Sequence, residues 1–250
     1  MPFRYLYWLS AGHRDPRADR HLGYILALIA GAVNAGGFLA IGQYTSHMSG
    51  IVSSMADNAA LGDFALTFSA LAAWLSFVSG AATTAILVNL AKRHCLQSQY
   101  ALCLLLESGL LLLFGIAGSN LSNMREFLTP VTVLLLCFIM GLQNAIITKA
   151  SGTLIRTTHV TGLSTDLGIE LGKLLYWNRR DLPHLAVIAD REKMKVHGRL
   201  ILYFVTGGVA GACGFKYIGY SATIILSAIL ALLAALPIYI DLQVRWKTRK

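Results

Sequence analysis

The sequence has few charged residues for its length. Asp, Glu, Lys and Arg make up 13% of the 250 residues, against about 25% in an ordinary soluble protein. The acids are the scarcer group, with 12 Asp and Glu against 21 Lys and Arg. So few charges, beside a hydrophobic share of 56%, exclude a sizeable soluble domain.

Signatures of enzymatic chemistry are also lacking. The four cysteines are scattered singly, without a CxxC pair, which argues against a disulfide framework or a thiolate metal site. No Walker loop, dinucleotide fingerprint or HExxH pattern is present. We therefore expect no enzyme activity, no cofactor and no metal. The net charge of +9 does not indicate nucleic acid, because the basic residues lie between apolar stretches and at the chain ends, as in membrane proteins.

The sequence instead contains six long apolar stretches. A helix needs about 20 apolar residues to cross a bilayer. Five stretches reach that length, and the sixth is completed by the long side chains of Arg199 and Lys216. We predict an all-α, polytopic transmembrane helical bundle with six full spans and a lipid bilayer as its surroundings. The predicted spans are Leu22–Gly42, Ala65–Ala91, Leu96–Met124, Phe127–Thr148, Leu200–Phe215 and Tyr217–Ile240.

The basic residues predict the orientation of these spans. With the N-terminus in the cytoplasm, the inner segments 1–21, 92–95, 149–199 and 241–250 hold 19 of the 21 Lys and Arg residues. Such a bias follows the positive-inside rule and places both termini in the cytoplasm. Two further helical segments, 49–61 and 160–177, carry acids. Letting both of them cross would weaken the bias, so we expect them not to span; re-entrant, crossing and interfacial placements stay open.

A short internal repeat divides the chain. The pattern Thr-[Ser/Thr]-His-x-[Ser/Thr]-Gly occurs at Thr45–Gly50 and at Thr157–Gly162, each time after an Asn-Ala pair in the preceding span. Phe77–Gly80 then recurs as Phe204–Gly207. We predict two repeats of three spans, each with a short polar re-entrant or broken helix. An odd number of spans turns the second copy upside down, as in many secondary transporters.

The predicted organisation is therefore one membrane domain with basic ends. Its parts are a cytoplasmic N-terminus over 1–21, membrane repeat 1 over 22–124, membrane repeat 2 over 127–240 with a basic cytoplasmic loop at 177–199, and a basic cytoplasmic tail over 241–250.

The two Ser/Thr-His turns are the candidate binding site. Hydroxyl groups cap helix starts, glycine permits close approach, and a helix N-terminus favours an anion or a polar carbonyl. The alternative is a pair of amphipathic braces at the membrane surface. A brace does not need imidazole, so the duplicated histidine favours a site. The candidate substrate-binding residues are Thr45, Ser46, His47, Ser49, Gly50, Thr157, Thr158, His159, Thr161, Gly162, Asn34 and Asn144. For the two asparagines, which lie in apolar spans, a hydrogen bond between helices is the favoured alternative.

Two acids are candidates for proton or ion coupling. Glu107 is the only acid well inside a predicted span, where a charge costs at least about 2.5 kcal/mol. Asp166 lies in the second polar segment, beside Glu170 and Lys173. The structural alternatives are a bond from Glu107 to a neighbouring helix and a surface ion pair in the polar segment.

The second polar segment resembles a known family. Gly141–Ala145 followed by Arg156–Gly168 is similar to the hallmark of the YoaK family of bacterial membrane proteins, and Thr45–Gly50 resembles its first-half motif. The likeness covers nearly the whole chain. The family often has Thr-Gly-Asn where Ser49, Gly50 and Ile51 stand here, so a role for that Asn is not carried over. The resemblance implies the bacterial inner membrane and this architecture, and it supplies no activity.

These observations favour a small secondary transporter, or permease, for a small polar or anionic solute. A non-transporting scaffold or signalling protein that acts through the basic loop is the alternative, and a channel is the weaker one. A homodimer is an open alternative to a monomer.

Overall fold

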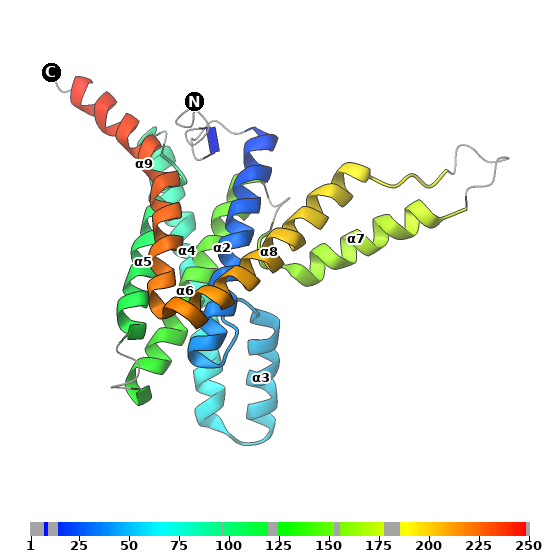
Figure 1. The fold of residues 1–250 in the computed structure, drawn as a ribbon, viewed down its shortest axis with the longest axis vertical. Coiled ribbons are helices and arrows are strands. Elements are labelled where there is room, and N and C mark those ends of the chain that lie inside the picture. The colour runs from blue at the N-terminus through cyan, green and yellow to red at the C-terminus, as the bar shows by residue number, and fades with distance from the viewer. Residues whose placement is uncertain are drawn as a thin grey trace.

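The computed structural model describes residues 8–9, 15–96, 98–119, 125–152, 156–177 and 186–248. This part of the chain is helical and contains no β-strand, which confirms the predicted all-α class. Its elements (Figure 1) are α2 (Pro16–Ile41), α3 (Met48–Ala60), α4 (Phe64–Arg93), α5 (Ala101–Ser119), α6 (Arg125–Ala150), α7 (Val160–Leu175), α8 (Arg191–Ile218), the 3-10 helix η2 (Gly219–Ser221) and α9 (Ala222–Thr248).

Five helical segments are long and apolar enough to cross a membrane: Pro16–Ile41, Phe64–Arg93, Ala101–Ser119, Thr129–Ala150 and Arg191–Val244. The last one contains α8, η2 and α9. Large apolar side chains such as Phe68, Ile86 and Val209 point outward from these helices. Exposed apolar surface on this scale fits a lipid surrounding. The chain is therefore a multi-pass membrane protein.

Helices from the two halves of the chain pack in pairs. α2 lies along α8, α4 lies along α6, and α5 lies along α9. Glycines make the first two crossings close. A methyl group at Gly31 of α2 would overlap the carbonyl oxygen of Phe204 on α8, and one at Gly141 of α6 would overlap that of Phe77 on α4. Small residues at helix contacts let backbones approach closely in membranes.

The α5–α9 crossing is held by two serines. The hydroxyl of Ser108 donates to the carbonyl of Ser227 at 2.9 Å, and the hydroxyl of Ser227 donates to the carbonyl of Ser108 at 2.9 Å. This reciprocal pair joins the third long helix of one half to the last helix of the other. All three crossings thus link one half of the chain to the other half.

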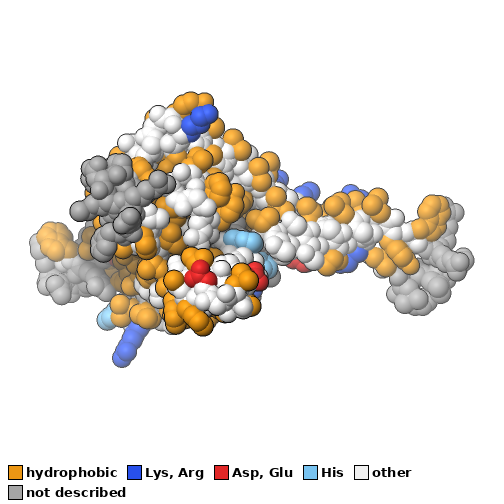
Figure 2. Space-filling view, turned by 90° about the horizontal axis from the view of Figure 1, so that it is seen from below, with side chains coloured by type: hydrophobic (Ala, Val, Ile, Leu, Met, Phe, Trp, Pro, Cys, Tyr) orange, Lys and Arg blue, Asp and Glu red, His pale blue; other side chains and the backbone are white. Residues whose placement is uncertain are grey.

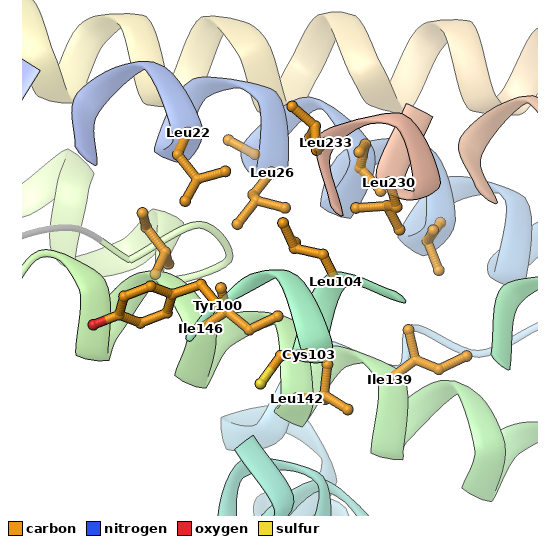
Figure 3. Packing of buried hydrophobic residues seen from close by; sticks show 14 of the residues in the cluster. Leu22, Leu26, Tyr100, Cys103, Leu104, Ile139, Leu142, Ile146, Leu230 and Leu233 are labelled. Atoms are coloured by element: carbon orange, nitrogen blue, oxygen red, sulfur yellow. The ribbon is translucent and has the colours of Figure 1, made fainter. Parts of the chain in front are cut away.

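The apolar core lies between α2, α5, α6 and α9. Leu26 from α2, Leu104 from α5, Leu142 from α6 and Leu230 from α9 are fully buried in one cluster, and Figure 3 shows them converging. This core fixes the ends of α2 and α6, from which the two polar turns leave.

Two helical hairpins extend from the bundle. α3 pairs with the beginning of α4, and α7 pairs with α8. The α7–α8 hairpin projects to the side in Figure 1. The short polar segments predicted at 49–61 and 160–177 correspond to α3 and α7, so their helical character is confirmed.

Two helix starts differ from the predicted spans. Within the basic segment 177–199, the chain is already helical from Arg191 onward, because the Asp190 side chain accepts a hydrogen bond from the backbone N–H of Lys193 at 2.9 Å and begins α8 there. The span predicted from Leu96 starts at Ala101, since the turn after α4, with Cys95 at a φ of 51°, extends further than expected. Residues 178–185 of that basic segment, most of the basic N-terminus and the last two residues of the tail lie outside the described residues.

Candidate functional site

The two repeated turns lead into α3 and α7 in the same way. In each, the histidine is the N-cap residue directly before the helix, His47 for α3 and His159 for α7. Neither imidazole makes a capping hydrogen bond. The prediction that the neighbouring hydroxyls cap the helices was wrong for Ser46, Thr157 and Thr158. Those hydroxyls bond instead to an asparagine of the preceding helix.

Asn34 and Asn144 hold the two turns in place. Asn34 Oδ1 accepts from the backbone N–H and the hydroxyl of Ser46, at 3.4 and 2.9 Å. Asn144 Oδ1 accepts from the backbone N–H of Thr158 at 3.4 Å and from the hydroxyl of Thr157 at 3.1 Å. Asn144 Nδ2 also donates to Thr158 Oγ1 at 2.5 Å. Both amides therefore position a turn, whereas the structural alternative predicted for them was a hydrogen bond between helices.

Each imidazole lies over the first turn of its own helix. A methyl group at Gly50 would overlap Nδ1 of His47, and one at Gly162 would overlap Nδ1 of His159. His47 Nε2 is also 3.2 Å from the hydroxyl of Ser49. The motif glycine leaves room for the histidine ring, which occupies the space that a side chain would take.

The two turns meet around one central cavity of about 520 Å³. Figure 2 shows histidine side chains at the surface where the α3–α4 hairpin and the projecting α7–α8 hairpin come together. Both halves of the chain contribute to the wall, although they are far apart in sequence. The lining residues are Ser46, His47, Met48, Ser49, Phe77, Asn144, Thr148, Arg156, Thr158, His159 and Thr161.

An outer cavity adjoins the central cavity on each side. His47 also lines a cavity of about 540 Å³, together with Tyr44, Gly50 and Asn58. His159 also lines one of about 410 Å³, and the other residues of its wall are Arg156, Gly162, Leu163, Thr165, Asp166 and His197. Each imidazole is thus a wall shared by the central cavity and one outer cavity.

The chain matches a known protein family over most of its length. Residues 22–236 match the model of the DUF1275 family, which is described as a protein of unknown function. The chain belongs to the DUF1275 family. This match confirms the resemblance to the YoaK membrane proteins, which are DUF1275 proteins. No curated protein and no solved structure matches the chain.

Not every predicted site residue of this DUF1275 protein reaches the central cavity. Ser46, His47, Ser49, Asn144, Thr158, His159 and Thr161 line it. Gly50 and Gly162 line the outer cavities. Thr45 and Thr157 are buried behind the turns, and Asn34 is bonded to Ser46 instead of lining the cavity.

The two predicted coupling acids lie elsewhere. Glu107 is fully buried in α5, and neither carboxylate oxygen has a hydrogen-bond partner among the described residues. Asp166 lines the outer cavity beside His159 and faces α8, where its oxygens lie 3.4 Å from Lys193 Nζ and 3.8 Å from His197 Nδ1. Asp166 is thus a link between the two helices of the hairpin.

Gln143 on α6 was not among the predicted site residues. Its side chain is fully buried, and its amide nitrogen and oxygen have no partner in the described part of the chain. Gln143 directly precedes Asn144 within the family motif, which was the available signal.

Glu170 closes the α7–α8 hairpin near its outer end. Its carboxylate accepts from Lys173 Nζ at 2.8 Å and from the backbone N–H of Asp190 at 2.8 Å. The bond from Lys173, which has the larger effect, and the bond from Asp190 hold the pKa of Glu170 below its usual value. The carboxylate therefore ties α7 to the start of α8 at neutral pH, and this tie is lost as the pH falls through the lowered pKa.

Proposed function

We propose that this DUF1275 protein is a small secondary transporter that moves a small polar or anionic solute across the bacterial inner membrane. The central cavity is its binding site. The observation that supports this most directly is the meeting of the two repeated Ser/Thr-His turns around one cavity, with an outer cavity beyond each histidine. Irregular backbone at membrane depth is tolerated where it lines such a cavity.

The inverted six-span plan belongs to the same proposal. The 54-residue segment Arg191–Val244 contains two crossings, because one crossing takes about 20 residues and η2 separates its two helices. α3 and α7, with 13 and 16 residues, are too short to cross. Both termini then lie in the cytoplasm. The matched pairing of α2 with α8 and of α6 with α4 fits two copies related by a two-fold axis in the membrane plane.

Reconstitution tests the proposal directly. The purified protein in liposomes should take up labelled solute from a panel of phosphate, sulfate, acetate, glycine and glucose, and uptake of at least one should saturate with concentration. Liposomes without protein give the background. Unitary currents would indicate a channel. Background uptake for every solute by folded protein would favour a scaffold acting through the segment 177–199.

Alanine at Gly162 is expected to impair transport without unfolding the protein. The methyl group displaces the His159 imidazole from the first turn of α7, while alanine favours the helix over glycine by about 1 kcal/mol. We expect uptake to fall about tenfold, because losing one hydrogen bond of about 1.4 kcal/mol weakens binding by that factor. The melting temperature should not change. Gly168→Ala, also on α7 but with open space around it, is the matched control and should transport normally.

Replacing Glu107 by Leu is expected to separate stability from coupling. Two buried oxygens without partners cost about 1–3 kcal/mol, so the leucine variant should melt at or above the wild-type temperature. If Glu107 carries the coupled proton, uptake driven by a pH gradient should disappear while exchange of solute at equal pH persists. Proton-driven uptake at the wild-type rate would remove Glu107 from the mechanism.

A further inference from the structure

We propose that the central cavity selects small oxyanions, such as carboxylates, phosphate or sulfate, and that Arg156 determines this selectivity. The inference rests on the proposed function, because it names the class of solute for the same site. In the sequence, Arg156 stands out only as one of the basic residues that set the orientation in the membrane and as the first residue of the family motif Arg156–Gly168, with no role in binding predicted for it.

The charge of the cavity wall supports an anion. Arg156 is the one Lys or Arg among the described lining residues, and no Asp or Glu is among them. Arg156 also has no ion pair among the residues that the structure describes. The carboxylate that shares an outer cavity with it, Asp166, lies beside Lys193 and His197 of α8. The guanidinium charge is therefore uncompensated and gives the cavity a positive potential.

The other polar groups of the wall supply hydrogen-bond donors. Ser49, Thr158 and Thr161 contribute hydroxyls, and His47 and His159 contribute imidazoles. α3 and α7 also begin at this cavity without a side-chain cap from their histidines, so the positive ends of both helix dipoles add to the guanidinium charge. A planar guanidinium binds carboxylate and phosphate oxygens in pairs, which makes an oxyanion a better ligand than a neutral solute.

The positive charge is not repeated in the other half. Arg156 directly precedes Thr157, and the residue that directly precedes Thr45 is Tyr44, which stacks on Phe38 at 4.5 Å between ring centroids. Tyr44 lines the outer cavity beside His47, whereas Arg156 lines both the central cavity and the outer cavity beside His159. An anion can thus meet the guanidinium from the central cavity and from the outer cavity on the α7 side, and it meets no such charge on the α3 side.

Charged thiol reagents test this potential without a known substrate. Thr161→Cys places a thiol in the cavity wall, and Cys95→Ser with Cys213→Ser removes the two exposed native thiols, while Cys103 and Cys137 are buried. The labelling rates of an anionic sulfonatoethyl and a cationic trimethylammonioethyl methanethiosulfonate are compared. We expect Arg156→Gln to lower the ratio of the anionic to the cationic rate by about tenfold.

Two matched variants isolate the charge. With Arg156→Lys, the ratio of the anionic to the cationic labelling rate should stay near that of the parent protein, because the positive charge is kept. Arg93→Gln should also leave it unchanged, since Arg93 lies about 24 Å along α4 from the cavity residue Phe77 at about 1.5 Å per residue. The anionic rate should fall as salt is added, because salt screens the potential. An unchanged ratio in folded Arg156→Gln protein would overturn the inference.

Uptake of sulfate, phosphate and acetate, compared with neutral glycerol, completes the test in liposomes. Anion uptake that is lost in Arg156→Gln and only partly reduced in Arg156→Lys, which keeps the charge but not the paired donors, supports the selectivity. An anionic labelling preference that depends on Arg156, without uptake of any solute, would leave the selective cavity in place and refute the transporter. Saturable glycerol uptake without uptake of the anions would refute the selectivity for anions and leave the transporter in place.

Discussion

Alanine at Gly141 is expected to destabilise the protein by about 3 kcal/mol or more, at the upper end of the usual cost of overpacking. The added methyl group would overlap the carbonyl oxygen of Phe77, and a backbone atom inside a helix cannot move aside alone. α4 and α6 would have to separate. That separation would also break the bonds from the Ser76 hydroxyl to the Leu134 carbonyl and from the Thr84 hydroxyl to the Leu142 carbonyl, at 2.7 and 2.9 Å.

Thermal unfolding of the purified protein in detergent measures this effect, with the yield of folded protein as a second readout. Gly172→Ala is the control, because a methyl group there has no neighbour within 4 Å and should be neutral or slightly stabilising. Gly31→Ala should be as damaging as Gly141→Ala, since it meets the Phe204 carbonyl in the matching crossing. A wild-type melting temperature for Gly141→Ala would show that α4 and α6 do not pack as described.

The helical spans and the paired turns were predictable because both leave local marks in the sequence. Long apolar runs mark membrane helices whatever they pack against, and a repeated His-x-[Ser/Thr]-Gly pattern marks two equivalent helix starts. The site itself depends on residues more than a hundred positions apart, such as His47 and His159, which line one cavity. The repeat suggested that meeting, and only the folded chain places the two turns around the same space.

Roles set by tertiary structure were harder to predict. A basic residue near a span serves orientation in most membrane proteins, so the place of Arg156 in the cavity wall was not apparent from charge counting. The hydroxyls of Ser46 and Thr157 bond to Asn34 and Asn144 of the preceding helices, so they do not cap α3 and α7. The bond from the Asp190 N–H to Glu170 joins positions twenty residues apart, so the pairing of α7 with the start of α8 could not be predicted from local sequence.

Removing both repeated histidines is expected to abolish transport. His47 and His159 are exposed in the cavity wall and cap neither helix, so alanine at either position should leave the protein folded. A hydrogen bond to a charged ligand is worth about 1.5–3 kcal/mol, and each 1.4 kcal/mol is about tenfold. Uptake should therefore fall at least tenfold in each single variant and to background in the double variant.

The combination of the two variants also reports how the histidines act. If one bound solute contacts both imidazoles, the two losses should not add, because residues that share a ligand are coupled. If each imidazole instead controls passage to its own outer cavity, either substitution should alter access from one side of the membrane. Oriented liposomes with solute added on one side or the other distinguish these cases. His94→Ala, at the end of α4, should transport normally, and saturable uptake by the double variant would exclude this pair from the path.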